Sequence, residues 1–162
     1  MADKITFSFG ENWSEYKKKA SPEQFDASLE DLETWLGTEN IKGKRILDIG
    51  CGSGVHSYNF YRLGAKELTS FDYDIHSVNT TRGFWKEAKE PSNWTVFQGS
   101  VLDENLMAGL GKYDIVYSWG VLHHTGSMWQ AIYNAIQTVA PGGLFWIAIS
   151  QGVDTYEYDL EL

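Results

Sequence analysis

The sequence predicts a doubly wound α/β fold, with a mostly parallel sheet of at least five strands and helices on both faces. Short apolar runs alternate with longer amphipathic segments from residue 45 onward, which is typical of β–α–β units joined by right-handed crossovers. The first of these runs ends in glycines at every second position, Gly50, Gly52 and Gly54. The 162 residues, 43% of them hydrophobic, are enough for one core, so we expect residues 1–162 to form a single domain.

The N-terminal part combines an aromatic arm with a helix. Residues 1–20 are rich in aromatic side chains and are expected to pack on the domain as an arm, or to cover a ligand as a lid. Ser21, Pro22 and Gln24 are typical of a helix start, and Gly37 of a helix end. The expected apolar face of this helix comprises Phe25, Leu29, Leu32, Trp35 and Leu36.

The segment 45–49 is expected to be a strand buried on both faces, because it is an almost continuous apolar run. The three glycines that follow permit positive φ and a close approach of backbone to a ligand. A helix from Ser53 onward would direct loop N–H groups toward that ligand. A dinucleotide fingerprint would need a glycine at position 55, and Val55 disfavours a nicotinamide-dependent oxidoreductase.

The remaining elements follow in order and are bounded by glycine or proline. We expect helices over 53–63, 75–90 and 128–139, with a short helical turn over 104–110, and strands over 67–72, 94–97, 113–118 and 144–149.

The segment 151–162 alternates apolar and acidic side chains, which is the pattern of a half-buried strand. The strand over 144–149 would otherwise be an exposed sheet edge, and exposed edges favour association. We therefore expect residues 156–162 to pair with a sheet edge of the same chain or of a neighbour. A homodimer through that edge is one possibility.

Charge and composition exclude several classes of partner. The net charge is −9, and the longest run of Lys or Arg is the three lysines at 17–19. This argues against nucleic acid or an anionic membrane as a partner, because both are bound largely through clustered cations. No apolar run approaches the roughly 20 residues of a membrane span, and no signal-peptide core follows the N-terminus. A cytoplasmic protein is expected. Cys51 is the single cysteine, so neither a disulfide nor a cysteine-based metal site is expected.

His123 and His124 follow the expected fourth strand. Adjacent side chains point in different directions and no acid or cysteine lies nearby, so the pair does not indicate a metal site. One histidine acting as a general base, with the other packed, is the functional interpretation. Two structural histidines are the alternative.

The segment from Asp48 to Gly54 resembles the E/D-x-G-x-G-x-G signature of class I S-adenosylmethionine-dependent methyltransferases. The chain is similar in particular to the small-molecule branch that includes ubiquinone and menaquinone biosynthesis enzymes. The resemblance implies a Rossmann-like sheet and methyl transfer from S-adenosylmethionine to an O, N or C atom of a small-molecule acceptor by in-line displacement, leaving S-adenosylhomocysteine. Further segments in family order are 70–74, 99–103, 113–124 and 140–143.

The resemblance also implies roles for individual residues. His124, or else His123, would be the base if the acceptor loses a proton, and no metal would be required. Asp48 would hold the loop amides and the cofactor's ammonium, and Asp72 would accept hydrogen bonds from the ribose. The other expected cofactor-binding residues are Gly50, Gly52 and Gly54 at the amino-acid end, Tyr73, Ser100 and Val101 at the adenine, and Ser118 and Trp119 at the methionine part.

Two departures from the family pattern matter. Ser100 occupies a position where an aspartate usually contacts the adenine, so that side-chain contact is in doubt. The family's sheet normally ends in an antiparallel hairpin, for which only residues 151–162 remain. A non-catalytic S-adenosylmethionine-binding module or a truncated methyltransferase domain is therefore the alternative function.

Overall fold

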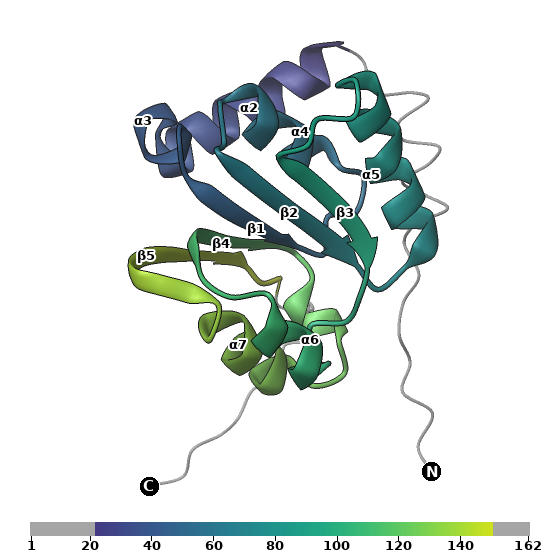
Figure 1. Cartoon of the computed structure of the whole chain (residues 1–162), viewed down its shortest axis with the longest axis vertical. Helices are drawn as coiled ribbons and strands as arrows, with labels where there is room; N and C mark the ends of the chain where they lie inside the picture. Colours follow the sequence, from purple (N-terminus) through teal and green to yellow (C-terminus); the bar gives the residue numbers. More distant parts are fainter. Residues whose placement is uncertain (1–21, 151–162) are drawn as a thin grey trace, which may run out of the picture.

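The computed structural model describes residues 22–150, with side chains from residue 25, and contains all five predicted strands. Figure 1 shows them as one sheet in the order β3-β2-β1-β4-β5, with every neighbouring pair parallel. The strands are β1 (Arg45–Ile49), β2 (Glu67–Asp72), β3 (Trp94–Gln98), β4 (Tyr113–Trp119) and β5 (Val139–Ala148).

The chain moves outward from β1 to β3 and then returns to place β4 on the other side of β1. The strand order therefore reverses between β1 and β4, which is where a doubly wound sheet opens a crevice at the carboxyl ends of its strands. The predicted fold class is confirmed.

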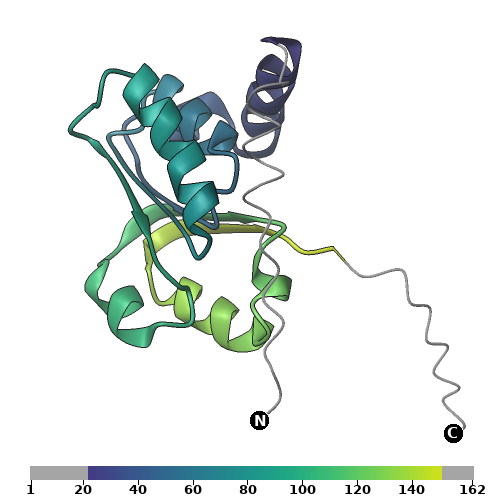
Figure 2. The ribbon, with the colours of Figure 1, turned by 90° about the vertical axis from the view of Figure 1, so that its right-hand side faces the viewer.

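Helices cover both faces of the sheet, as Figure 2 shows. One layer contains α2 (Pro22–Leu36), α4 (Val55–Arg62) and α5 (Ile75–Glu87), and the other contains α6 (Glu104–Gly109) and α7 (Met128–Ile136). Two short elements complete the fold, α3 (Thr38–Ile41) and the 3-10 turn η1 (Leu122–His124).

Alternate residues of the central strands supply two separate cores. Ile46 packs with Leu32 of α2 and Phe60 of α4, whereas the next residue, Leu47, packs on the other face with Met107 of α6. All of these side chains are buried. Burial of each is worth about 1.5–3 kcal/mol, so a central strand must be apolar on both faces. This confirms the interpretation of residues 45–49 as a strand buried on both sides.

Several element boundaries differ from the predictions, and two of these differences have a clear local cause. The helix after the glycine loop begins at Val55 rather than Ser53, because Gly54 adopts a left-handed conformation with φ of 79° immediately before it. Val139 lies in β5 opposite Tyr113 and not in the preceding helix. That helix ends at Ile136, because Thr138 folds back and donates from both its backbone N and its Oγ1 to the Ala135 carbonyl.

The aromatic arm (1–20), the capping serine at position 21 and the alternating tail (151–162) lie outside the described residues. Those expectations stay predictions. Among residues 22–150, no helix combines the length and the apolar character needed to cross a membrane.

Candidate active site

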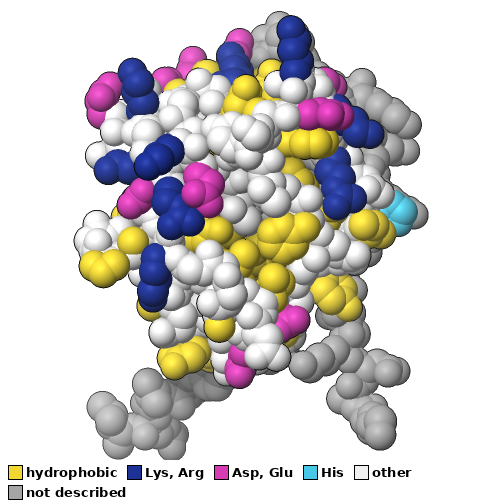
Figure 3. Space-filling view, in the orientation of Figure 1, with side chains coloured by type: hydrophobic (Ala, Val, Ile, Leu, Met, Phe, Trp, Pro, Cys, Tyr) yellow, Lys and Arg dark blue, Asp and Glu magenta, His cyan; other side chains and the backbone are white. Residues whose placement is uncertain are grey.

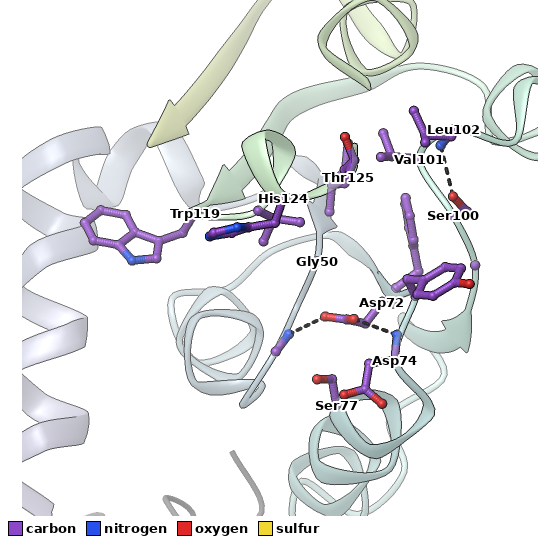
Figure 4. A pocket seen from close by; sticks show the side chains of 17 residues that line it. Gly50, Asp72, Asp74, Ser77, Ser100, Val101, Leu102, Trp119, His124 and Thr125 are labelled. Atoms are coloured by element: carbon purple, nitrogen blue, oxygen red, sulfur yellow. Dashed lines mark hydrogen bonds between the residues drawn. The ribbon is translucent and has the colours of Figure 1, made fainter. Parts of the chain in front are cut away.

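A cavity of about 600 Å³ lies at the carboxyl ends of β1 to β4, beside the point where the strand order reverses. Figure 4 shows side chains from the loops after these four strands around it. Eight of the predicted site residues line its wall: Gly50, Gly52, Asp72, Tyr73, Ser100, Val101, Trp119 and His124.

At two of the loop glycines the surrounding packing leaves no room for a side chain. Gly50 has φ of 75°, and a Cβ there would lie 2.5 Å from the methyl groups of Val121. Gly54 has φ of 79°, and a Cβ there would lie 2.8 Å from the backbone of Thr81. Gly54 does not line the cavity, and its contribution is to let the loop turn tightly into α4.

The loop amides make different hydrogen bonds from those we expected. Gly50 N and Cys51 N donate to the Phe71 carbonyl at 2.8 and 3.1 Å, and Gly52 N donates to Asp72 Oδ2 at 2.9 Å. The expectation that the loop directs its N–H groups at a ligand is therefore wrong for these three amides. The end of β2 lies beside β1 and supplies nearer acceptors.

Asp72 is held at the centre of the cavity wall by two backbone groups. Its Oδ2 accepts from Gly52 N, and its Oδ1 accepts from Asp74 N at 2.9 Å. Figure 4 shows both bonds. Burial raises the pKa of this carboxyl above its ordinary value, while the two backbone donors oppose the rise. An ionised carboxylate has about four lone-pair sites, so Asp72 retains capacity to accept from ligand hydroxyls.

Asp48 lies behind the wall rather than on it. It is 2% exposed and accepts from Ser57 Oγ at 2.5 Å, and Ser57 in turn contacts Ser70 Oγ at 2.7 Å. Burial raises the pKa of Asp48 to about 7, the Ser57 hydrogen bond lowers it, and the charge of Asp72 raises it. The structure therefore makes Asp48 part of the support beneath the glycine loop.

Ser118 is also buried behind the cavity. Its Oγ donates to the Ile49 carbonyl at 2.9 Å and so joins the carboxyl ends of β4 and β1. Trp119, the next residue, does reach the wall and is 43% exposed.

The two histidines differ in position, since only one of them lies on the cavity wall. His124 lines the cavity, whereas His123 does not, and His123 Nε2 pairs with Ser150 Oγ at 2.8 Å. Their ring centroids lie 3.9 Å apart. Burial and the neighbouring His124 lower the pKa of His123. Within residues 22–150, no three His, Cys, Asp or Glu side chains are grouped closely enough to hold a metal ion.

The end of the cavity beyond Asp72 presents flat and apolar groups. Tyr73 is 61% exposed there, and Val101 and Leu102 lie on the wall formed by the loop after β3. Ser100 Oγ accepts from Leu102 N at 3.1 Å, which leaves the hydroxyl hydrogen available to a ligand. Asp103 caps α6 by accepting from Leu106 N.

The cavity wall also contains residues that the sequence did not single out as ligand contacts. Asp74 caps α5, and it lines the cavity as well. Ser77 lies three residues further, on the same side of the first turn, and this spacing could have revealed it. Val121 and Thr125 carry no comparable signal, since their place depends on how η1 folds back over the glycine loop.

An aromatic cluster borders the cavity at Trp119. The indole of Trp119 stacks on Trp35 of α2 at 4.6 Å and on Trp146 of β5 at 5.4 Å. His56 packs edge-on against Trp119, and its Nδ1 lies 3.1 Å from the Tyr117 hydroxyl. Burial lowers the pKa of His56 to about 4, so this ring is neutral near pH 7. The cluster gives the Trp119 end of the cavity a rigid apolar border.

The cavity is thus mainly apolar and contains one carboxylate, Asp72, which backbone hydrogen bonds hold in place. A side chain at Gly50 would clash with Val121, just before η1. A mainly apolar pocket with a few placed polar groups is typical of a small-molecule or cofactor site. The arrangement fits a nucleoside whose ribose lies at Asp72.

A family model described as "Methyltransferase domain" matches residues 19–156. A ubiquinone biosynthesis O-methyltransferase of Methylobacterium sp. (strain 4-46) is 32% identical over 113 residues, covering 70% of this chain and 43% of the relative. A tRNA U34 carboxymethyltransferase of Trichlorobacter lovleyi is 30% identical, covering 64% of this chain and 31% of the relative. The chain spans less than half the length of these curated relatives.

Solved structures share the fold. A putative S-adenosylmethionine-dependent methyltransferase from Methanococcus maripaludis superposes with a TM-score of 0.70 at 18% identity, over 91% of this chain and 66% of the other. Magnesium protoporphyrin IX methyltransferase from Synechocystis, solved with bound S-adenosylhomocysteine, gives a TM-score of 0.61 at 20% identity, over 81% and 64%.

Proposed function

Since this chain belongs to the class I S-adenosylmethionine-dependent methyltransferase family, we propose that its cavity binds S-adenosylmethionine and that the protein methylates a small-molecule acceptor. The observation that carries the proposal is Asp72, held by two backbone donors where the cavity passes from the glycine loop toward β3. We also infer that residues 1–162 act as one domain, and that the protein works in the cytoplasm, which its single cysteine supports.

Four groups of residues would hold the cofactor. Asp72 would accept from the ribose hydroxyls, and the exposed ring of Tyr73 would lie against the adenine, with Ser100 and Val101 at the adenine edge. Gly50 and Gly52 would face the amino-acid end, and Trp119 would border the methionine part. Asp48, Gly54 and Ser118 would act indirectly, by fixing the loop and the strand ends beneath it.

When bound, S-adenosylmethionine supplies a methyl group activated by the positive charge on sulfur. The protein's own task is then to align a nucleophile and to exclude water. The stacked indoles beside Trp119 make a rigid apolar border suited to both. His124 lies on the wall near Trp119 and would take the proton of an acceptor that must lose one. His123, bonded to Ser150, would help to position the neighbouring ring.

The net charge of −9 supports a small molecule over a nucleic acid as acceptor, because nucleic acids are bound largely through clustered cations. One curated relative carries the name of a ubiquinone-pathway enzyme and another that of a tRNA-modifying enzyme, so both classes belong in the test. A non-catalytic cofactor-binding module is the second candidate function.

Calorimetry with S-adenosylmethionine, S-adenosylhomocysteine and NAD tests the cofactor first. Binding of NAD in preference to both others would refute the assignment. Incubation with labelled S-adenosylmethionine, once with a small-molecule extract and once with bulk tRNA, then tests the acceptor by mass spectrometry. Label in the small-molecule fraction is expected. Label in tRNA would refute the acceptor class, and cofactor binding without any transfer would favour the non-catalytic module.

A further inference from the structure

The loop after β3 forms the end of the cavity at which the proposed function places the adenine. An adenine presents two groups on its outer edge, an N1 atom that accepts a hydrogen bond and a 6-amino group that donates hydrogen bonds. A site that recognises both groups must therefore offer one donor and one acceptor. Ser100 and Val101 are the residues of this loop that would face that edge.

The acceptor oxygens of these two residues already take part in hydrogen bonds within the protein. Ser100 Oγ accepts from Leu102 N at 3.1 Å, and the Ser100 carbonyl accepts from Asp103 N at 3.0 Å. The Val101 carbonyl accepts from Asn134 Nδ2 at 2.8 Å. Asn134 belongs to α7 and is buried, so water does not compete for this bond. Each of the three oxygens therefore has at most one lone pair left, and none carries a charge.

The carboxylates nearest to this loop in the sequence lie elsewhere in the structure. Asp103 caps α6, and both Asp103 and Glu104 are exposed and do not line the cavity. Figure 3 shows acidic side chains at the surface where Figure 1 places α6. The carboxylates on the described wall are Asp72 and Asp74, which come from the end of β2 and the start of α5 (Figure 4). The loop after β3 thus offers the base no charged acceptor.

The hydrogen-bond donors of the loop differ from its acceptors in being available. Val101 N donates no hydrogen bond to any residue in the part of the chain that the structure describes. The Ser100 hydroxyl hydrogen is available as well, because its oxygen acts as the acceptor toward Leu102. The Val101 side chain is buried, and Asn134 holds its carbonyl, so the position of this backbone is fixed. Val101 N–H is therefore suited to donate to an acceptor such as N1.

We propose that this site recognises the base of its cofactor through N1 and not through the 6-amino group, and that Ser100 determines this specificity. The inference rests on the proposed function, which places a purine here. A hydrogen bond to a charged acceptor contributes about 10- to 150-fold in affinity, and one between neutral groups about 2- to 10-fold. Tyr73 is 61% exposed at this end of the cavity, so the 6-amino group would keep its contact with water. Removal of that group should therefore change affinity little.

Calorimetry on the full-length chain with two analogues of S-adenosylhomocysteine tests the proposal. The 6-deamino analogue lacks the amino group but keeps N1 as an acceptor, and its Kd should be less than about fivefold that of S-adenosylhomocysteine. The inosine analogue carries a hydrogen on N1 that would face Val101 N–H, and its Kd should be at least about tenfold higher. A larger rise for the first analogue, or a smaller one for the second, would overturn the proposal. Failure of S-adenosylhomocysteine itself to bind would refute the proposed function instead.

Ser100→Asp supplies the charged acceptor that the loop lacks. An aspartate can accept from Leu102 N two residues further on, as the serine does, so the loop should keep its conformation. The Kd of the 6-deamino analogue relative to that of S-adenosylhomocysteine should then be at least about tenfold higher than in the unmodified protein. Asp103→Ala is the matched control, because it removes a carboxylate outside the cavity and should leave this Kd ratio unchanged. An unchanged ratio in a folded Ser100→Asp protein, or a lower ratio in Asp103→Ala, would overturn the proposal, and the measurements on the unmodified chain need neither variant.

Discussion

Replacing Asp72 by alanine perturbs the group that the proposed cofactor site depends on most. Its carboxylate accepts from Gly52 N and Asp74 N, each at 2.9 Å, so the change removes the acceptor of both amides as well as that of the ligand hydroxyls. Hydrogen bonds to a charged acceptor contribute about 1.5–3 kcal/mol, and the Kd for S-adenosylmethionine should therefore rise about 10- to 150-fold. Loss of the two amide contacts should also lower the free energy of unfolding by about 1–3 kcal/mol.

Calorimetry measures the Kd and urea unfolding measures the stability of the same variant. Asp72→Asn keeps one acceptor oxygen and should give intermediate values of both. Asp103→Ala is the matched control, because Asp103 also accepts a backbone hydrogen bond, from Leu106 N at 3.0 Å, but does not line the cavity. It should lose about 0.5–2 kcal/mol of stability as a lost helix cap, with no change in Kd. A folded Asp72→Ala protein with the original Kd would refute the ribose assignment.

Gly52 has φ of 51°, a left-handed conformation that strains a β-branched residue, so Gly52→Val should destabilise the protein by about 1–2 kcal/mol. The variant should also raise the cofactor Kd more than tenfold. Normal binding in calorimetry would mean that the loop is not the cofactor site. Once an acceptor is known, His124→Ala should lower kcat by about 10²–10⁴ in steady-state assays at nearly unchanged Kd. His123→Ala, which would disturb only the position of the His124 ring, should lower kcat less, and equal effects would contradict the assignment of the base. The folded-state pKa of Asp48, about 7, lies above its ordinary 3.8. Between about pH 4 and 7, Asp48 is protonated in the folded state and ionised in the unfolded state. The free energy of unfolding, measured by urea titration, should therefore fall as the pH rises through this range, and Asp48 contributes at most about 1.4 kcal/mol per pH unit to the fall. Asp48→Asn should remove this dependence of stability on pH, and an unchanged dependence would show that another group titrates. Ser57→Ala removes the hydrogen bond that lowers the pKa of Asp48, so the fall in stability should continue to higher pH.

Burial explains why the strands could be predicted so well from the sequence. A strand covered by helices on both faces needs apolar side chains on both, and Ile46, Leu47 and Ile49 of β1 supply them. The wall positions of Asp72 and the glycine loop could be predicted for a related reason. Residues that follow parallel strands meet at one edge of the sheet, whatever the details of packing.

Boundaries and hydrogen-bond partners were harder to predict, because they depend on contacts between distant segments. Val139 has a residue type that suits helix or strand, and its pairing with Tyr113 decided the matter. Ser118 follows β4 as a wall residue would, yet it turns to the Ile49 carbonyl 69 residues away. The residues next to Val139 and Ser118 in the sequence do not indicate that Tyr113 and Ile49 will be their partners.

The sequence by itself determined the order of the elements, the alternation that builds two cores, and the positions at which acids and glycines follow the strands. Only the tertiary structure decided which of those groups reach the cavity. Gly50 and Cys51 donate to Phe71, and Asp48 binds Ser57 beneath the loop. The physical reason is that a polar group takes the nearest acceptor or donor once water is removed, and which group is nearest is known only after the strands have been set side by side.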